Sequence, residues 1–152
     1  MSGRLVRQAR PKELATVLNL AVAFYAESGF STPVPELRKN MEVLLNSDQA
    51  RVATAEYHGE IVGLAITTLS FGLEQGHIAE LEDLYVRPAH RRIGIAGALI
   101  DDSSTWARSR GCSMLELVIA QRGDSEDDLL DFYARRGFTD EGRRLLSRIV
   151  GN

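Results

Sequence analysis

The segment from residue 78 to residue 119 constrains the fold more than any other part of the chain. A strand, Ile78–Val86, is stopped by Pro88, and a glycine-containing loop leads into a helical pattern over 94–110. Gly111 is placed to cap that helix, and Met114–Ile119 is an apolar stretch typical of a strand covered on both faces. A strand, a helix and a second buried strand in succession predict a sheet with helices packed against it.

The segments on either side complete this picture. Before it, we expect a strand over Leu5–Ala9, a helix from Pro11 to Gly29 and a second helix beginning near Pro35. Two further strands, 51–56 and 60–69, are joined by a tight turn at 57–59. After it, we expect a helix that Asp124 or Ser125 caps and that ends at Gly137, then a strand pair from Phe138 onward.

Arg91–Gly97, the loop between the central strand and its helix, has the features of a phosphate site. The first turn of a helix has unpaired N–H groups and a partial positive charge, which favour an anion. Gly94 lets the backbone approach a ligand closely, and Arg91 and Arg92 add positive charge on the same side. The spacing differs from the dinucleotide fingerprint, and no Gly-Lys-Ser or Gly-Lys-Thr follows as in a P-loop.

The segment Leu81–Ala96 resembles the central motif of the GNAT superfamily of N-acetyltransferases. That motif joins a strand of the form Leu-x-x-Leu-x-Val-x-Pro to a loop of the form Arg/Gln-x-x-Gly-x-Gly/Ala, and both halves are present. Downstream, the run Phe132-Tyr133-x-x-x-Gly137-Phe138 resembles the second common motif of the superfamily. The resemblance covers nearly the whole chain. It implies one α/β (α+β) domain over 1–152: a single mixed, mostly antiparallel sheet with a central, splayed parallel strand pair and helices on both faces.

The resemblance also implies how acetyl-CoA, the co-substrate, is bound. Backbone N–H groups of the loop are expected to hold its pyrophosphate, and the strand end at Leu84, Tyr85 and Val86 is expected to pair with its pantetheine arm. The full set of expected cofactor-binding residues is Leu84, Tyr85, Val86, Arg91, Arg92, Ile93, Gly94, Ile95, Ala96 and Gly97. Leu81 and Leu84 differ in parity, which predicts a β-bulge near Glu82 or Asp83.

Acetyl transfer to an amine needs a deprotonated nitrogen and a proton for the departing thiolate. Tyr133 matches the position at which the superfamily commonly carries its general acid. Glu80 and Glu82 are expected on the strand facing the thioester, as base or as anchors for a cationic acceptor, with Asp83 a third candidate. Cys112 has no evident histidine partner, so a covalent mechanism is not expected.

The acceptor is expected to be a small-molecule amine. The carboxylates suit a polycation such as an aminoglycoside, and the chain is most similar to acetyltransferases of the aminoglycoside and aminoalkylphosphonate types. Four aromatic residues are candidates for its wall: Phe24, Tyr25, Phe30 and Phe71. Two alternatives remain open: a peptide or protein amine as acceptor, and an acyl-CoA-binding sensor domain without catalysis. Glu126 and Leu129 stand where many relatives have asparagine and alanine, which is compatible with the sensor.

Charge and composition exclude other classes of protein. A net charge of −3 argues against a broad nucleic-acid-binding surface. No apolar run approaches the roughly 20 residues that span a bilayer, and the N-terminus lacks the apolar stretch of a secretory signal. With one cysteine in 152 residues, a cytoplasmic protein is expected. No metal is expected, and a homodimer is expected by resemblance.

Overall fold

The computed structural model of the protein describes residues 3–120 and 126–151. The chain divides into two compact units, Met1–Leu117 and Val118–Asn152. Whether the two form one domain over 1–152, as predicted, stays a prediction. In the described ranges, no helix is both long enough and apolar enough to cross a membrane.

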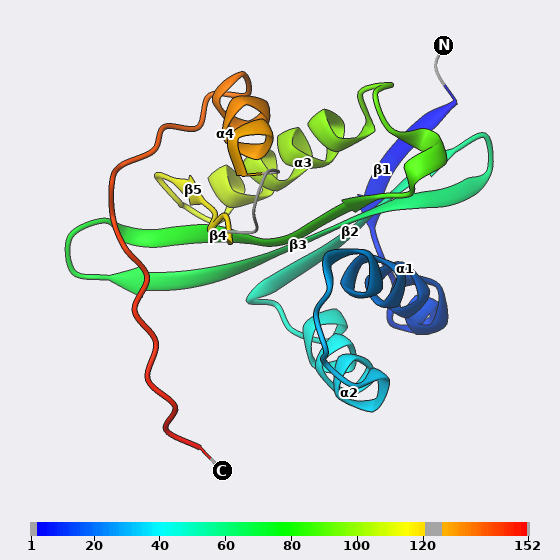
Figure 1. Cartoon of the computed structure of the whole chain (residues 1–152), viewed down its shortest axis with the longest axis horizontal. Coiled ribbons are helices and arrows are strands. Elements are labelled where there is room, and N and C mark those ends of the chain that lie inside the picture. Colours follow the sequence, from blue (N-terminus) through cyan, green and yellow to red (C-terminus); the bar gives the residue numbers. More distant parts are fainter. Residues whose placement is uncertain (1–2, 121–125, 152) are drawn as a thin grey trace. The chain divides into compact units, whose positions relative to one another are not determined.

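The first unit is built on one sheet in which neighbours in space are neighbours in sequence (Figure 1). Four strands run antiparallel in the order β1-β2-β3-β4, and β5 pairs with β4 in parallel. The strands are β1 Arg4–Gln8, β2 Ala50–Tyr57, β3 Glu60–Gly72, β4 Gly76–Val86 and β5 Leu115–Glu116. The predicted fold class, a mixed sheet with one parallel pair, is confirmed.

Helices cover both faces of this sheet. α1 (Leu14–Ser28) follows a short 3-10 turn at Pro11–Glu13, and α1 and α2 (Val34–Leu45) pack on one face (Figure 1). The core on that face joins residues of both helices to three strands: Val17, Leu20, Ala21, Met41, Leu45, Val52, Leu64, Ile66 and Tyr85. α3 (Ile95–Ser109) covers the other face, where Gly63 admits Leu99 and Ile95 so closely that a Cβ would lie 3.1–3.3 Å from them.

Local sequence explains where these elements end. α1 ends at Gly29, whose φ of 75° is the left-handed conformation that glycine adopts without steric cost. Between β2 and β3, His58 (φ 51°) and Gly59 (φ 83°) are both left-handed, as a two-residue type I′ turn requires. The predicted hairpin is therefore confirmed. After Val86, Pro88 begins a second 3-10 turn, Pro88–His90, that leads into the loop before α3.

The predicted strand over Met114–Ile119 is much shorter in the structure. Only Leu115 and Glu116 pair, with Ala79 and Glu80 of β4, and neither is fully buried. β5 is the last strand in the order of the sheet. We expected the parallel pair at the centre of the sheet, but it lies at one edge. The physical reason is that, among the described strands, β5 pairs only with β4. Without a second neighbouring strand, its backbone forms hydrogen bonds on one side only.

The second unit contains α4 (Glu126–Ala134) and an extended C-terminal segment, 138–151. The expected strand pair from Phe138 onward is not formed: no ladder joins residues of this segment in the described range, and its side chains are largely exposed. Gly142 bends the segment at φ 73°, with its N–H donating to Asp140. A turn of this kind favours a hairpin locally, but a strand also needs a partner. The predicted caps, Asp124 and Ser125, lie outside the described residues.

Candidate active site

A β-bulge in β4 organises the first part of the site. Ile66 pairs with Asp83 but the next residue, Thr67, pairs with Leu81, so Glu82 is an extra residue in β4. Successive residues of a regular strand point to opposite faces, and the bulge cancels that alternation. Glu82 and Asp83 consequently both line the cavity on the face covered by α1 and α2. The bulge predicted from the parity of the leucines is confirmed.

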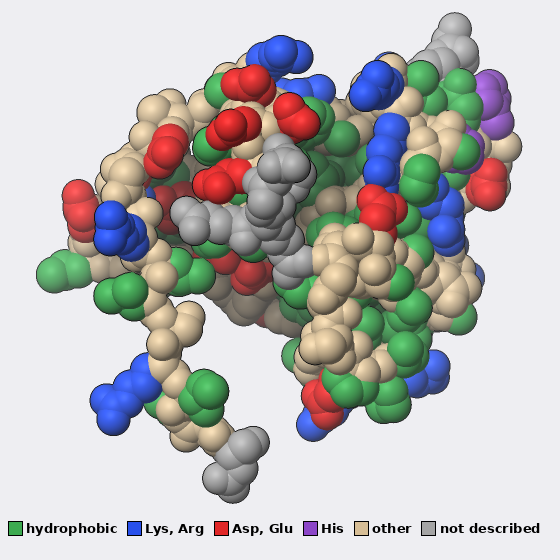
Figure 2. Space-filling model, in the orientation of Figure 1, with side chains coloured by type: hydrophobic (Ala, Val, Ile, Leu, Met, Phe, Trp, Pro, Cys, Tyr) green, Lys and Arg blue, Asp and Glu red, His purple; other side chains and the backbone are tan. Residues whose placement is uncertain are grey.

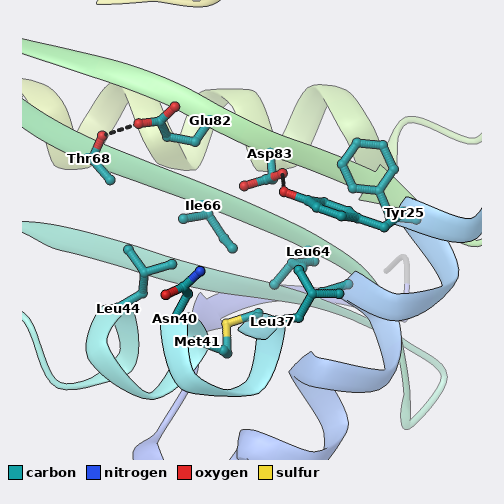
Figure 3. Close-up of a pocket in the computed structure, with 12 residues that line it drawn as sticks. Tyr25, Leu37, Asn40, Met41, Leu44, Leu64, Ile66, Thr68, Glu82 and Asp83 are labelled. Carbon is teal, nitrogen blue, oxygen red and sulfur yellow. Dashed lines mark hydrogen bonds between the residues drawn. The ribbon is translucent and has the colours of Figure 1, made fainter. Parts of the chain in front are cut away.

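Hydrogen bonds hold these two carboxylates in place. The hydroxyl of Thr68 on β3 donates to Glu82 over 2.8 Å, and the phenol of Tyr25 on α1 donates to Asp83 over 3.1 Å (Figure 3). Tyr25 also lies edge-on to Phe24, with 5.5 Å between the ring centroids. Each carboxylate is thus oriented by a neighbouring element and retains oxygen atoms for a ligand.

Glu80 completes a cluster of three carboxyl groups. A hydrogen bond with Glu82, burial, and the charges of Glu82 and Glu116 together raise the pKa of Glu80 to about 7. Burial raises the pKa of Asp83 as well, although the hydrogen bond from Tyr25 opposes this change. Burial, together with Asp83 and Glu82, raises the pKa of Tyr25 to about 12, so this phenol stays protonated. Close carboxyl groups that share a proton near neutral pH are suited to proton transfer.

Glu82 and Asp83 border a cavity of about 290 Å³ between α1, α2 and the sheet. Its walls are mostly apolar, and Figure 3 shows side chains of α2 facing those of β3 and β4 across it. The lining residues are Ala21, Phe24, Tyr25, Leu37, Asn40, Met41, Leu44, Leu64, Ile66, Thr68, Glu82 and Asp83. An apolar cavity with a few converging polar groups is the usual form of a small-molecule site.

The second part of the site is the loop before α3. Gly94 begins the helix at φ 89°, and in the described ranges no side chain caps this end. Arg4 of β1 donates to the carbonyl of Ile93 over 2.9 Å, and a Cβ on Gly94 would lie 2.5 Å from the same guanidinium. Figure 2 shows basic side chains gathered where β1 and the start of α3 lie in Figure 1. An uncapped helix start beside guanidinium groups is suited to a phosphate.

The side chains of the expected cofactor-binding residues fall into two groups. Tyr85 and Val86 are buried in the structure, and Tyr85 stacks on Phe24 at 5.3 Å, so neither side chain is available to a ligand. Arg91 donates to the carbonyl of Val86 and pairs with Glu27 of α1 at 2.7 Å. That side chain therefore joins the loop to α1, whereas Arg92, left-handed at φ 65°, is exposed.

β4 is longer than its ladder with β5. Its ladder with β5 ends at Glu80, and β4 continues from Leu81 to Val86 without a partner from β5. A strand that keeps one edge free has backbone groups available for an extended ligand. This end of β4 leads directly through Pro88 to the loop at 91–97.

Tyr133 lies in the second unit, on α4. The rings of Phe132 and Phe138 stand edge-on to its ring at 5.0 and 5.5 Å. Gly137 (φ 90°) ends the helix, and the N–H of Phe138 donates to the carbonyl of Tyr133 over 3.1 Å, the bond of a Schellman motif. Burial raises the pKa of Tyr133, so its hydroxyl is protonated at neutral pH and able to donate.

The structure brings together Glu80 and Glu82, as predicted from their equal parity, and adds Asp83 to them. Phe24 and Tyr25 line the cavity, while Phe30 packs against them and Phe71 is 73% exposed. Sequence reasoning missed Thr68 and Asn40. For Thr68 a signal existed, since it shares a face with Leu64 and Ile66 at a spacing of two residues.

Comparison with known proteins adds a family. Residues 14–138 match the acetyltransferase (GNAT) family. An uncharacterised N-acetyltransferase of Methanocaldococcus jannaschii is 28% identical over 100 residues, which are 64% of this chain and 43% of that protein. The chain thus spans less than half the length of that relative. An aminoglycoside N(6′)-acetyltransferase of Klebsiella aerogenes is 27% identical over 115 residues, covering 74% of this chain and 76% of that one.

A solved structure supports the fold over the full length of the chain. An aminoglycoside N-acetyltransferase in complex with CoA superposes with a TM-score of 0.84. The match covers 99% of this chain and 97% of that one at 19% sequence identity. At that identity, the likeness concerns the fold alone.

Proposed function

This chain belongs to the acetyltransferase (GNAT) family, and on that basis we propose that it transfers an acetyl group from acetyl-CoA directly to a primary amine of a small molecule. One observation carries the proposal. Glu82 and Asp83, which the bulge puts on one face, line a cavity of small-molecule size, and Glu80 is hydrogen-bonded to Glu82 beside them. The same compact unit contains a helix that begins after Gly94 without a side-chain cap in the described residues. The carboxyl groups at the cavity suit an amine, and the start of α3 suits a phosphate.

Acetyl-CoA supplies the acetyl group as an activated thioester. The backbone N–H groups from Ile93 to Gly97 hold its pyrophosphate, and Arg92 adds a positive charge. The free edge of β4 at Leu84–Val86 hydrogen-bonds the pantetheine arm. The start of α3, which has no side-chain cap in the described residues, and the end of the β4–β5 ladder at Glu80 support this assignment.

The acceptor enters as an ammonium ion, and a carboxylate must remove a proton before the nitrogen can attack. Glu80, with its pKa near 7, accepts that proton at neutral pH, and Glu82 shares it through their hydrogen bond. Asp83 stabilises the positive charge of the incoming amine. Tyr133, whose raised pKa keeps its hydroxyl protonated, donates a proton to the departing sulfur, and its place in the motif supports this role.

A small molecule is favoured over a peptide because the cavity is bounded by two helices and the sheet. Aminoglycosides and aminoalkylphosphonates are the first acceptors to test, since a relative acts on aminoglycosides by name. A sensor without catalysis would need neither the carboxyl cluster nor Tyr133.

The test is to incubate the purified protein with acetyl-CoA and a panel of primary amines and to follow release of the CoA thiol. Amine-dependent release with a matching acetylated product is expected. If no amine is acetylated while acetyl-CoA still raises the melting temperature, the chain binds the cofactor without transferring from it. If acetyl-CoA does not stabilise the protein either, the assignment of the loop is wrong.

A further inference from the structure

The cavity has two unlike sides. On the β4 side lie Glu82 and Asp83, with Thr68 and Tyr25 as their hydrogen-bond donors. On the α2 side lie three apolar side chains, Leu37, Met41 and Leu44, and Figure 3 shows them facing Leu64 and Ile66 of β3. Asn40 is the one polar residue that α2 contributes to the described lining.

All the charge of the lining is at one end. Of the described residues that form the cavity, only Glu82 and Asp83 carry acidic side chains, and the bulge puts these two sequence neighbours on the same face. The charged residues of α2 point elsewhere, as Arg38 and Glu42 do, whose mutual ion pair is more than half exposed. A ligand with several spread cationic groups would place some of them against leucine and methionine, where burying a charge is costly.

The volume limits how much of a ligand the cavity can enclose. About 290 Å³ is the space of roughly ten water molecules, and it lies at the lower end of the range of small-molecule sites. An amine with one ring or a short aliphatic chain fits within it. A two-ring or three-ring amino sugar would extend into solvent and leave the α2 side poorly filled.

We infer that the ligand of this cavity is a compact amine with one cationic nitrogen on an apolar body, and not a polycationic sugar. The nitrogen lies at Glu82 and Asp83, and the body packs between Leu37, Met41 and Leu44 of α2 and Ile66 of β3. As an account of the acceptor this rests on the proposed function, but as an account of binding it can be measured independently of catalysis.

Binding separates the candidate ligands directly. Calorimetric titration of the full chain with 2-phenylethylamine and ethanolamine compares two primary amines that differ only in an apolar or a polar end. We expect 2-phenylethylamine to bind about tenfold more tightly, because its ring is removed from water, and neamine, a polycation, to bind more weakly than 2-phenylethylamine. Equal affinities for the two simple amines, or tighter binding of neamine, would overturn the inference.

Two adjacent residues of α2 provide a matched pair of variants. Leu44 is half-buried and lines the cavity, whereas Val43 is 65% exposed and does not line it. In Leu44→Gln we expect affinity for 2-phenylethylamine to fall about fivefold while that for ethanolamine is unchanged. Val43→Gln should change neither, and circular dichroism should show that both variants are folded. Equal losses for both amines in Leu44→Gln would show that the apolar side does not contact the ligand.

Turnover distinguishes this inference from the proposed function. If 2-phenylethylamine binds as expected and no amine is acetylated, the proposed function fails and the inference about the ligand stands. If neamine is acetylated with a higher kcat/KM than 2-phenylethylamine, the proposed function stands and the inference is wrong.

Discussion

The proton between Glu80 and Glu82 determines how activity should vary with pH. With its pKa raised to about 7, Glu80 is protonated in acid and ionised above neutrality. As the proposed base it works only when ionised, so kcat/KM should rise as the pH increases through about 7. In Glu80→Gln we expect a large loss of kcat and loss of this inflection, measured as pH–rate profiles. If the pH–rate profile of Glu80→Gln is unchanged, another residue is the base.

The same shift affects stability with the opposite sign. The folded pKa of Glu80 lies above the ordinary value of 4.5, so between these two values the folded protein binds the extra proton. Stability must therefore fall as the pH rises through this window. We expect Glu80→Gln to melt at a higher temperature than the parent at pH 8 and to differ little at pH 5. Thermal denaturation at both values tests this, and a variant less stable at pH 8 would contradict it.

Tyr133 permits a conservative test of the proposed acid. Tyr133→Phe retains the ring that packs edge-on to Phe132 and Phe138 and removes only the hydroxyl. If that hydroxyl protonates the departing sulfur, kcat should fall about 100-fold while the Kd of acetyl-CoA stays within twofold. Steady-state kinetics and calorimetry measure the two quantities. A parallel loss of cofactor affinity would indicate a binding role for the hydroxyl.

At the scale of elements, the two glycines at the ends of α3 form a controlled comparison. Gly94 and Gly111 are both left-handed, but a Cβ on Gly94 would meet Arg4 and one on Gly111 would meet nothing within 4 Å. Gly94→Ala should raise the Kd of acetyl-CoA about tenfold, since the strained turn displaces the loop. Both variants should lower the melting temperature by a similar amount, because each puts an alanine in a left-handed conformation. Gly111→Ala should leave the Kd of acetyl-CoA unchanged. Equal Kd values for acetyl-CoA in the two variants would show that the loop at 91–97 does not bind the cofactor.

Sequence predicted those elements whose signals are local. The left-handed turn at His58 and Gly59, the end of α1 at Gly29 and the bulge at Glu82 all follow from a few neighbouring residues. The strands at 114–119 and beyond 138 were overestimated, because an apolar stretch or a turn signal indicates only that a segment can pair. Whether it does pair depends on a partner strand distant in sequence.

The candidate site divides in the same way. Its residues from Glu80 through Gly97 could be proposed from the sequence because they are contiguous in the chain, and their roles stay a prediction. Thr68 of β3 and Asn40 of α2 were not expected from the sequence: Thr68 donates to Glu82, and Asn40 lines the same cavity. Tyr25 was expected in the wall of the acceptor site, but its hydrogen bond to Asp83 was not. The register that brings Thr68 beside Glu82 is a consequence of the bulge, and it could be located only once the pairing of β3 with β4 was known.

At the scale of the whole molecule, the segment 138–151 exposes several large apolar side chains. Four of its apolar side chains are at least 72% exposed: Leu145, Leu146, Ile149 and Val150. Surfaces of this kind commonly mark interfaces between proteins. We expect the chain to form a homodimer in solution and the double variant Leu146→Ser, Val150→Ser to be monomeric, as measured by light scattering. A parent that is monomeric at high concentration would contradict this.

The consecutive order of the strands has a consequence for synthesis. Each strand of the sheet pairs with the one made just before it, and short turns join β2 to β3 and β3 to β4, whereas helices separate β1 from β2 and β4 from β5. The three central strands can therefore pair early, because local contacts form quickly. The cavity and the loop of Gly94 belong to Met1–Leu117, whereas Tyr133 is translated later. A growing chain therefore acquires the parts proposed for ligand binding first. The residue proposed for proton donation to sulfur is added last.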